Sequence, residues 1–279
     1  MTKLNLPYLL IDIGGSYTRL TVSKNSISFV EPEVFKTPKN FSKAVKKIKL
    51  HADKCLGNEK PGIVVVGVAG PLNSDKSALT NPPNLKAWSG KPLQNKLSNI
   101  FGTQVFLEND AAIVGLGEAS KGAGVNYSIV SYITVSTGIN GARIIDKKID
   151  RNAQGFEIGH HIIDVDKSIL KKSKGELEDF ISGREIKKRF DKDPFEIEDN
   201  TVWSEVAKFL AVGIHNTILF WSPEVVVLGG SLMKKISLSE TKKELEKVMK
   251  IHPKLPEIKK AQLGNFGGLW GALEYAKSL

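Results

Sequence analysis

Two short apolar segments enclose a pair of glycines near the start of the chain, and this arrangement limits the fold more than any other feature. Residues 8–12 and 19–23 have the continuous or alternating apolar patterns of β-strands, and Gly14-Gly15 lies between them. Paired glycines between two strands favour a tight β-hairpin, because glycine adopts the backbone conformations that such turns require. The chain is therefore predicted to begin with a sheet, to which residues 27–30 add a third strand.

The segments that follow predict helices packed on a buried sheet. Residues 62–68 form a run rich in β-branched side chains, typical of a strand that is covered on both faces. A lysine-rich amphipathic helix is predicted before this run, at 41–55. Two more helices are predicted at 91–100 and 110–120, with a strand at 104–107 between them. This alternation of helices and strands predicts an α/β fold.

The second half of the chain repeats this structural plan. Strands predicted at 128–136 and 141–146 flank Thr137-Gly138, just as the first two strands flank Gly14-Gly15. The later predicted elements are a long helix at 202–221, an apolar strand at 224–228 ending in Gly229-Gly230, a lysine-rich helix, a short strand near 258–263 and a terminal helix. The acidic segment 191–200 is predicted to be the most flexible connection. Two lobes are expected, each with helices against a sheet.

Composition argues against several classes of protein. The chain of 279 residues is 41% apolar and 25% charged, which is ordinary for a globular protein, and no apolar run reaches the roughly 18 to 20 residues that span a bilayer. The first residues lack the pattern of a signal peptide, so a cytoplasmic location is expected. Cys55 is the single cysteine, which excludes an internal disulfide or a cluster of several thiolates around a metal. Cys55 is expected to be a small buried or half-buried hydrophobe.

The net charge of +10 raises the question of nucleic acid binding. The lysines are scattered, and their densest groups, at 43–49, 167–174 and 242–250, have no interleaved aromatic side chains on which bases would stack. These groups are interpreted as solvated helix faces or a loop, and no nucleic acid partner is expected. A basic surface would also attract anionic nucleotides and sugar phosphates.

The first glycine loop has the composition of a phosphate-binding loop. Asp12 lies two residues before Gly14-Gly15, and Ser16 follows them. Backbone N–H groups in such a loop can bind phosphate oxygens, while the carboxylate faces a magnesium ion or its waters. Taken alone, the same five residues are more often an ordinary tight turn. Small-residue loops at 135–141 and 229–231 also follow predicted strands, and three such loops predict a nucleotide-binding cleft.

The order and spacing of these motifs resemble the ROK family (repressor, open reading frame, kinase) of sugar kinases, within the actin-like ATPase superfamily. The matching motifs are Asp12 to Ser16, Gly67 to Pro71 with Asn84-Leu85, Leu107 to Ala111, Ser136-Thr137-Gly138, Gly155 to His160 and Leu228-Gly229-Gly230. The resemblance covers nearly the whole chain. It implies an α/β, two-lobed actin-like ATPase fold, duplicated and ribonuclease H-like, with mixed sheets flanked by helices. The implied lobes are 1–109 plus 265–279 and 110–264.

The resemblance also implies a reaction, the ATP-dependent phosphorylation of a hexose hydroxyl by a hexokinase-type enzyme. Glucose, converted to glucose 6-phosphate, is the first expectation, and N-acetylmannosamine, N-acetylglucosamine and fructose are alternatives that the sequence does not separate. Asp110 would be the catalytic base, whereas its residue type alone fits a helix N-cap better. The nucleotide would bind at Asp12, Gly14, Gly15, Ser16, Thr137, Gly138, Gly229 and Gly230, with Asp12 also facing magnesium directly or through water. The sugar would bind at Gly70, Asn84, Asn109, Asp110, Glu157, His160 and Glu178.

One stretch departs from the family pattern. Most members continue with Cys-x-Cys-Gly-x-x-Gly-Cys-x-Glu, which binds structural zinc, whereas here residues 166–174 precede Gly175-Glu176-Leu177-Glu178. The thiolates are absent, and one histidine cannot hold zinc at structural affinity, so ATP and magnesium are expected as cofactors and zinc is not. The 166–175 segment must then be ordered by packing or by substrate. His161 is expected to be a packed or surface histidine without a ligand.

The family also contains sugar-responsive transcriptional repressors, which supply the rival hypothesis. Repressors add an N-terminal helix-turn-helix, and none is expected here because the first phosphate loop begins at Asp12. A sugar sensor without turnover is a third possibility, against which the retention of Asp12, Asp110 and Glu157 argues. Family members are commonly dimers, so a homodimer is expected, although no periodic pattern identifies its interface.

Overall fold

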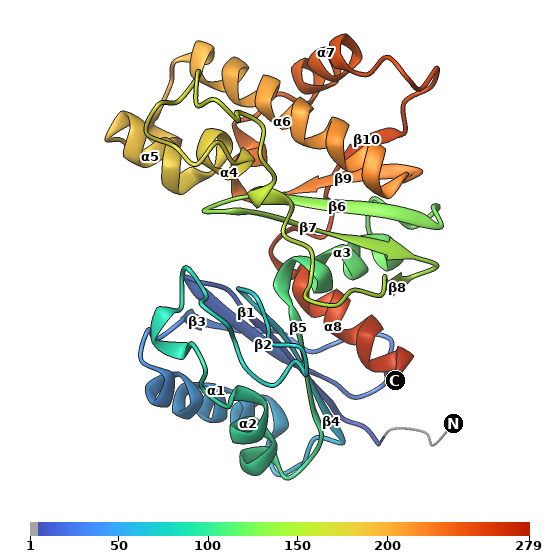
Figure 1. Cartoon of the computed structure of the whole chain (residues 1–279). Coiled ribbons are helices and arrows are strands. Elements are labelled where there is room, and N and C mark those ends of the chain that lie inside the picture. Colours follow the sequence, from blue (N-terminus) through green and yellow to red (C-terminus); the bar gives the residue numbers. More distant parts are fainter. Residues whose placement is uncertain (1–4) are drawn as a thin grey trace. The chain divides into compact units, whose positions relative to one another are not determined.

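The computed structural model describes residues 5–279, which divide into two compact units (Figure 1). The first unit comprises the chain up to Gly122 together with Lys147–Gly155 and Leu263–Leu279. The second comprises Ala123–Asp146 and Phe156–Gln262. Each unit is therefore assembled from segments that lie far apart in the sequence.

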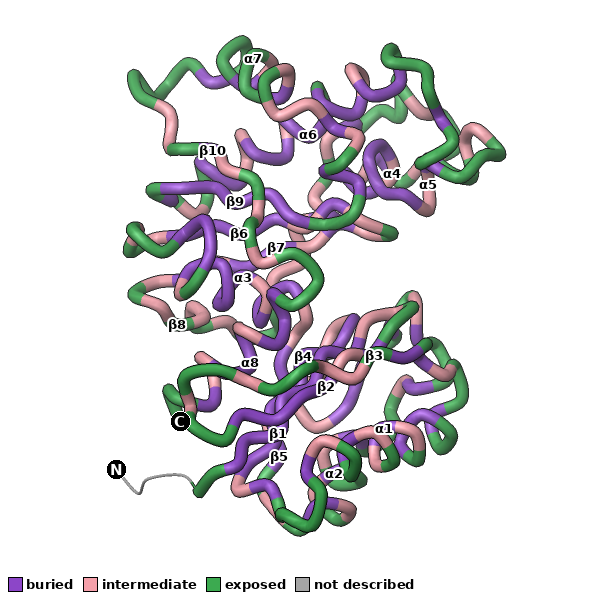
Figure 2. The backbone as a smooth tube through the Cα atoms, turned by 180° about the vertical axis from the view of Figure 1, so that it is seen from behind, coloured by how far each residue is buried: buried purple, intermediate pink, exposed green. Residues whose placement is uncertain are grey.

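A five-stranded mixed sheet forms the centre of the first unit, with the strand order β3-β2-β1-β4-β5. Its strands are β1 (Tyr8–Ile13), β2 (Tyr17–Ser23), β3 (Glu33–Lys36), β4 (Ile63–Val68) and β5 (Val105–Asn109). The pairs β1/β2 and β2/β3 are antiparallel, and β4 runs parallel to both β1 and β5. Every residue of β1 and β4 is buried, as their continuous apolar runs predict (Figure 2). The carboxyl ends of β1, β4 and β5 consequently meet at one edge of the sheet.

Helices cover both faces of this sheet. The helices are α1 (Phe41–Leu56), α2 (Leu93–Phe101), α3 (Asp110–Lys121) and α8 (Gly267–Ser278), with single turns at Lys86–Trp88 and Gly264–Phe266. The segment Lys147–Gly155 of this unit contains the short strand β8 (Lys148–Ile149). Alternate strand residues such as Leu9 and Ile11 pack with α1 and α2 on one face. Their neighbours, such as Leu10 and Val65, pack with Ile113 of α3 and with α8 on the other. The period-two alternation of a strand thus builds two cores from one sheet.

The third strand is not at 27–30, where the sequence pattern predicted it. The side chain of Asn25 accepts hydrogen bonds from the backbone N–H groups of Ile27 and Ser28, at 2.9 Å each, and ties this segment into a turn. β3 instead begins at Glu33 and pairs with β2. The polar turn residues before Ile27 therefore outweigh the strand propensity of Ile27, Phe29 and Val30.

The second sheet has five strands in the order β10-β9-β6-β7-β8. Besides β8, its strands are β6 (Ile129–Val135), β7 (Ile139–Ile145), β9 (Val225–Gly229) and β10 (Glu257–Lys260). β6 and β7 form an antiparallel hairpin, and β9 runs parallel to β6 and β10. This confirms the repeated plan, because each unit opens its sheet with a hairpin around a small-residue loop.

The helices of the second unit pack on one large core. They are α4 (Leu177–Ile181), α5 (Gly183–Phe190), α6 (Asn200–Trp221) and α7 (Leu238–Val248), with single turns at Ile158–His160, Pro194–Glu196 and Ser231–Lys234. α6 contributes more buried side chains to this core than any other helix, and it contacts both α4 and α7. Asp199 is its N-cap and accepts a hydrogen bond from Thr201 N–H at 2.8 Å. Among residues 5–279, no helix is both long and apolar enough to cross a membrane.

α3 and α8 approach each other closely because glycines face each other across their contact. A Cβ on Gly117 would lie 2.5 Å from the carbonyl oxygen of Gly267, and a Cβ on Gly271 would lie 1.7 Å from that of Ile113. This packing keeps α3 within the first unit. The lobe boundary expected at 109/110 differs from this division, because it cuts the chain at the first residue of α3.

Candidate active site

Asp12 lies near the end of β1 in the first unit and is 8% exposed. The hairpin register places it opposite Arg19, whose Nη1 is 3.7 Å from Asp12 Oδ2. The first turn of α8 closes over the carboxylate, because a Cβ on Gly268 would lie 2.7 Å from Asp12 Cγ. Gly268 is therefore required for the close approach of α8, and Asp12 is confined between a strand and a helix N-terminus.

The carbonyl groups of the loop after Asp12 accept hydrogen bonds from the segment 37–39. Thr37 Oγ1 donates to Gly14 O at 2.8 Å, Lys39 Nζ donates to Gly15 O at 2.7 Å, and Thr37 N–H donates to Ser16 O at 2.9 Å. In contrast, no group within residues 5–279 accepts from the N–H groups of Gly15 or Ser16, or bonds Ser16 Oγ. A loop whose carbonyls are occupied and whose N–H groups are available is suited to binding an anion such as phosphate.

The segment predicted to border the sugar lies against this loop. A Cβ on Gly15 would lie 2.8 Å from the Cβ of Asn84, so only glycine allows this contact. Lys39 Nζ also donates to Asn84 O, at 3.0 Å, and so joins the two segments. Gly70 has a φ of +127° and its carbonyl accepts a hydrogen bond from Asn109 Nδ2 at 3.2 Å. Gly15, Asn84, Gly70 and Asn109 are thus brought together at one edge of the sheet.

Asn109, not Asp110, is the N-cap of α3. The Asn109 Oδ1 atom accepts from the backbone N–H of Ala111 at 2.9 Å and of Ala112 at 3.3 Å. Asp110 is the first helical residue, and its Oδ1 accepts from the Ala111 N–H at 2.9 Å. The N-cap role that residue type favours for Asp110 is therefore filled by its neighbour, and the Asp110 carboxylate is left for another task.

Both carboxyl groups have raised pKa values. Burial, with a smaller contribution from the negative charge of Asp110, raises the pKa of Asp12 to about 7 against the opposing effect of Arg19. Burial also raises the pKa of Asp110 to about 6, although hydrogen bonds from the N–H groups of Ala111 and Asp110 lower it. Two carboxyl groups that titrate near neutral pH and influence each other are a common sign of a catalytic or cation-binding site.

In the second unit, the other two small-residue loops lie together. Ser136 Oγ is 3.3 Å from Ser231 Oγ, and Gly230, with a φ of +91°, leaves no space for a side chain beside Val135 O. The loop at Thr137-Gly138 is anchored through carbonyls, because Gly183 N–H donates to Ser136 O at 2.8 Å and Arg184 N–H donates to Thr137 O at 3.1 Å. The second loop thus resembles the first, because its carbonyl groups accept hydrogen bonds from the protein while the N–H groups of Thr137 and Gly138 remain for a ligand among the described residues.

The Glu178 carboxylate bonds and contacts the backbone of this second loop. Its Oε2 atom accepts from Ile139 N–H at 2.9 Å and would lie 2.8 Å from a Cβ on Gly138, while Arg184 Nη2 pairs with Oε1. The Glu178 side chain is 11% exposed. The contact between Glu178 and a sugar that the family resemblance implies remains a prediction, since the carboxylate already has these two partners.

The segment predicted to read the sugar forms a single turn packed on β7. A Cβ on Gly159 would lie 2.4 Å from Ile139 O, so this turn sits directly on the start of the strand. Glu157 N-caps the turn, and His160 ends it. His160 Nδ1 is 2.8 Å from Glu176 Oε2, and its side chain is 47% exposed. Burial lowers the pKa of His161, which bonds Ile158 O and packs against the protein as expected.

A carboxylate orders the 166–175 segment. Asp164 is 5% exposed, and its two oxygens accept from the backbone N–H groups of Ser168, Ile169 and Leu170 at 3.0 to 3.3 Å. Burial acts to raise the pKa of Asp164, but these hydrogen bonds outweigh it and hold the pKa below its usual value. Gly175 closes the segment, because its carbonyl accepts from the N–H groups of Ile163 and Asp164. These hydrogen bonds support ordering by packing, one of the two expected possibilities.

Replacing Asp164 by alanine is expected to loosen this segment. The N–H groups of residues 168–170 would lose their acceptor, so the loop would open more often. We expect trypsin to cut at Lys171, Lys172 and Lys174 on the order of ten times faster than in the wild type. Asp166→Ala, at an exposed neighbouring carboxylate, is the control. Equal cutting of the two variants would contradict the role of Asp164.

Several residues that shape the site were missed by the sequence analysis. Arg19 was identifiable, since it lies directly opposite Asp12 in a hairpin with a short loop. Lys39, Thr37 and Gly268 carry no local signal, because their importance depends on contacts across the fold. Within residues 5–279, no group of three or more His, Cys, Asp or Glu side chains is arranged to hold a metal ion.

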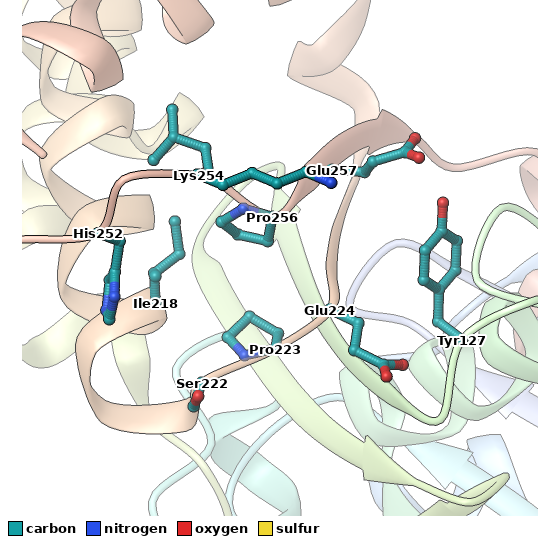
Figure 3. Close-up of a pocket in the computed structure, with 10 residues that line it drawn as sticks. Tyr127, Ile218, Ser222, Pro223, Glu224, His252, Lys254, Pro256 and Glu257 are labelled. Carbon is teal, nitrogen blue, oxygen red and sulfur yellow. The ribbon is translucent and has the colours of Figure 1, made fainter.

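A pocket of about 380 Å³ in the second unit lies away from these loops (Figure 3). It is lined by Tyr127, Pro223, Glu224, Pro256 and Glu257 among others. These residues stand at the amino-terminal ends of β6, β9 and β10, whereas Gly229-Gly230 stands at the carboxyl end of β9. Glu224 has a structural role there, because its Oε2 accepts from the N–H groups of Ser128 and Ile129. The pocket therefore does not form part of the candidate site.

Comparison with known proteins places these features in one family. Residues 8–278 match the sequence profile of the ROK family. Among curated relatives, the N-acetyl-D-glucosamine kinase of Yersinia enterocolitica is 27% identical over 301 residues, covering 95% of this chain and 97% of that protein. A putative xylose repressor of a Caldicellulosiruptor species is 25% identical, covering 84% of this chain and 68% of that protein.

Solved structures show the same fold. A ROK hexokinase from Thermus thermophilus superposes with a TM-score of 0.84 at 23% identity, covering 98% of this chain and 99% of the other. A ROK family glucokinase from Streptomyces griseus, solved with glucose and AMPPNP, gives a TM-score of 0.81 at 22% identity, covering 98% of this chain and 100% of the other. The α/β fold of actin-like ATPases, with two mixed sheets flanked by helices, is thereby confirmed.

Proposed function

The chain belongs to the ROK family, and from this premise we propose that it is a sugar kinase that transfers the γ-phosphoryl group of ATP to a hydroxyl of a hexose. The relatives include both kinases and a repressor, so family membership alone does not decide between catalysis and sensing. The residues of the site supply the argument for catalysis.

The environment of Asp110 carries this proposal. Its carboxylate starts a helix that Asn109 already caps, it is only partly exposed, and its pKa is raised to about 6. A base in this pKa range is ionised at neutral pH and is a better proton acceptor than an ordinary aspartate. The Asp110 carboxylate does not stabilise the fold, because a charge removed from water beside Asp12 is destabilising. Retention of the carboxylate therefore supports a chemical role.

In the proposed reaction, Asp110 accepts the proton of the sugar hydroxyl as its oxygen attacks the γ-phosphorus of ATP. A bond forms between this oxygen and the γ-phosphorus, the bond from the γ-phosphorus to the bridging oxygen of the β-phosphate breaks, and ADP leaves. Most of the rate enhancement in such reactions comes from positioning and electrostatic stabilisation. The proposed ATP contacts are the N–H groups of Gly15 and Ser16 in the first unit, and of Thr137 and Gly138 with Gly229-Gly230 in the second.

Magnesium is proposed to accompany ATP. Asp12 fits a cation because its carboxylate oxygens are suitable ligands and its charge is poorly compensated by Arg19, 3.7 Å away. A bound magnesium ion would neutralise charge on the phosphates. Directly or through water, Asp12 is the residue of the first unit that would hold it.

Glucose is the proposed substrate. The polar groups Asn109, Asp110, Glu157 and His160 are suited to hydroxyl groups in general and include no side chain dedicated to an acetamido group. The kinship with an N-acetyl-D-glucosamine kinase makes N-acetylglucosamine the main competitor. A homodimer stays a prediction, which sedimentation analysis would measure.

A coupled assay tests the proposal. Purified protein is mixed with ATP, magnesium and one sugar from a panel of glucose, mannose, fructose, N-acetylglucosamine and N-acetylmannosamine, and ADP release is followed. We expect turnover that depends on the sugar, with glucose giving the highest kcat/KM. Sugar binding by calorimetry without turnover of any of these sugars would instead support a sensor.

The rate should depend on pH in a direction that the Asp110 pKa sets. The base acts in its ionised form, so protonation removes activity. Because the pKa of Asp110 is about 6, kcat/KM at saturating magnesium is expected to fall as the pH is lowered below 7, with a midpoint near 6. A profile that stays flat down to pH 5 would contradict the role of Asp110 as the base.

A further inference from the structure

His160 and Glu176 form a side-chain pair beside the proposed sugar site. His160 ends the turn Ile158–His160, and its Nδ1 atom is 2.8 Å from Glu176 Oε2. The Glu176 side chain is 16% exposed and that of His160 is 47% exposed. The carboxylate is thus largely enclosed, while much of the imidazole remains accessible to a ligand.

The backbone fixes the position of Glu176. It is the N-cap of α4, and its N–H donates to Asp179 Oδ2 at 3.1 Å. It also pairs with Ile162 in an isolated β-bridge. Lys174 Nζ lies 3.6 Å from Glu176 Oε2, on a side chain that is 72% exposed. These two attachments fix the backbone of Glu176, from which its carboxylate reaches His160, and the ion pair with Lys174 is peripheral.

The pair determines which nitrogen of His160 carries the proton. An ionised carboxylate only accepts hydrogen bonds, so Nδ1 must be the donor. In a neutral imidazole the other nitrogen, Nε2, then has a lone pair and is an acceptor. Among the hydrogen bonds within residues 5–279, none involves His160 Nε2. An accessible acceptor with a fixed direction is available to a hydroxyl group.

We propose that Glu176 is a positioning residue that holds His160 as the Nδ1–H tautomer, so that Nε2 accepts a hydrogen bond from one hydroxyl of the sugar. The inference rests on the proposed function, because it takes the ligand to be a sugar. In the family pattern Glu176 stands where a cysteine precedes the final glutamate, so this chain places a carboxylate directly on the histidine. Glu176 acts through His160 and does not itself touch the substrate.

The tautomer can be measured without any substrate. Nitrogen-15 NMR of labelled histidine distinguishes Nδ1–H from Nε2–H rings, and the His160 signal is assigned by its loss in His160→Gln. Spectra at alkaline pH compare neutral rings. We expect the Nδ1–H form in the wild type, the Nε2–H form in Glu176→Ala, and a mixture in Glu176→Gln, because an amide can either accept or donate. Lys174→Ala, which removes only the peripheral ion pair, should match the wild type.

Kinetics then test the positioning role. A lost hydrogen bond to an oriented group should raise the KM for the sugar about tenfold in Glu176→Ala, while the KM for ATP changes less than about twofold. Lys174→Ala should leave both values unchanged. An equal loss in both KM values would show a merely structural role for Glu176, and that outcome overturns the proposal.

The two claims fail separately. A wild-type His160 in the Nε2–H form, or a tautomer that Glu176→Ala does not change, overturns the role of Glu176 even in an active kinase. Absence of turnover with every sugar overturns the proposed function. In that case the role of Glu176 is still decided by the NMR result, together with the sugar affinities of the same variants measured by calorimetry. Circular dichroism checks that each variant folds, and Glu176→Gln, which preserves the side-chain volume, serves if Glu176→Ala does not.

Discussion

Asp110→Asn is expected to lower kcat by about 10² to 10⁴-fold while leaving sugar affinity nearly unchanged. The range is that of general base catalysis by a positioned side chain. Asparagine has almost the same shape as aspartate but cannot accept the proton of the attacking hydroxyl. Since Asn109 caps α3, the substitution does not remove the helix cap. Turnover is measured by ADP release, and sugar binding by calorimetry.

A matched control separates this effect from a general effect of removing charge. Asp53→Asn removes a carboxylate of the same unit that is 49% exposed and paired with Lys49 on the surface of α1. This variant should keep wild-type kinetics. If Asp110→Asn retains more than about a tenth of the wild-type kcat, Asp110 is not the base.

Asp12→Asn is expected to abolish magnesium-dependent turnover and yet stabilise the metal-free protein. The pKa of Asp12 is raised from 3.8 to about 7, so the native state binds a proton that the unfolded state releases between these values. The free energy of unfolding of the wild type therefore falls as the pH rises from about 4 to 7. Asparagine does not ionise, so the variant avoids this decrease in the free energy of unfolding. At about 1.4 kcal/mol for each unit of pKa shift, the decrease amounts to about 4 kcal/mol at most.

Urea unfolding with a metal chelator present, at pH 5 and pH 8, measures this effect. The stability advantage of Asp12→Asn over the wild type should be larger at pH 8 than at pH 5. Asp53→Asn again serves as the control, with a small and pH-independent change. If Asp12→Asn is less stable than the wild type at both pH values, the Asp12 carboxylate does not destabilise the fold. If its turnover is unchanged, Asp12 is not needed for catalysis.

Elements that have a strong local signal in the sequence were predictable. Strand β4 was recognisable from its continuous β-branched run, and the hairpin β1/β2 from the glycines between its strands. Both signals are local, because they reflect burial of one strand and the backbone needs of one turn. β3 was misplaced because the turn chemistry of Asn25, rather than strand propensity, decides where the chain turns.

The electrostatics of the site were not predictable from the sequence. The pKa of Asp12 depends on α8 closing over it and on Asp110, a residue 98 positions later. The pairing of His160 with Glu176 depends on the fold of the segment between them, which Asp164 orders. The motif pattern identified the residue types, whereas partners and burial arise only when distant segments pack.

Direct detection of the phosphorylated sugar tests the central claim. Protein is incubated with ATP labelled at the γ-phosphate, magnesium and glucose, and the products are separated, with Asp110→Asn treated in parallel. We expect labelled glucose 6-phosphate and ADP in equal amounts, only with magnesium, and almost none from Asp110→Asn. If folded wild-type protein labels neither glucose nor any other hexose or N-acetylhexosamine of the panel, the chain is not a sugar kinase.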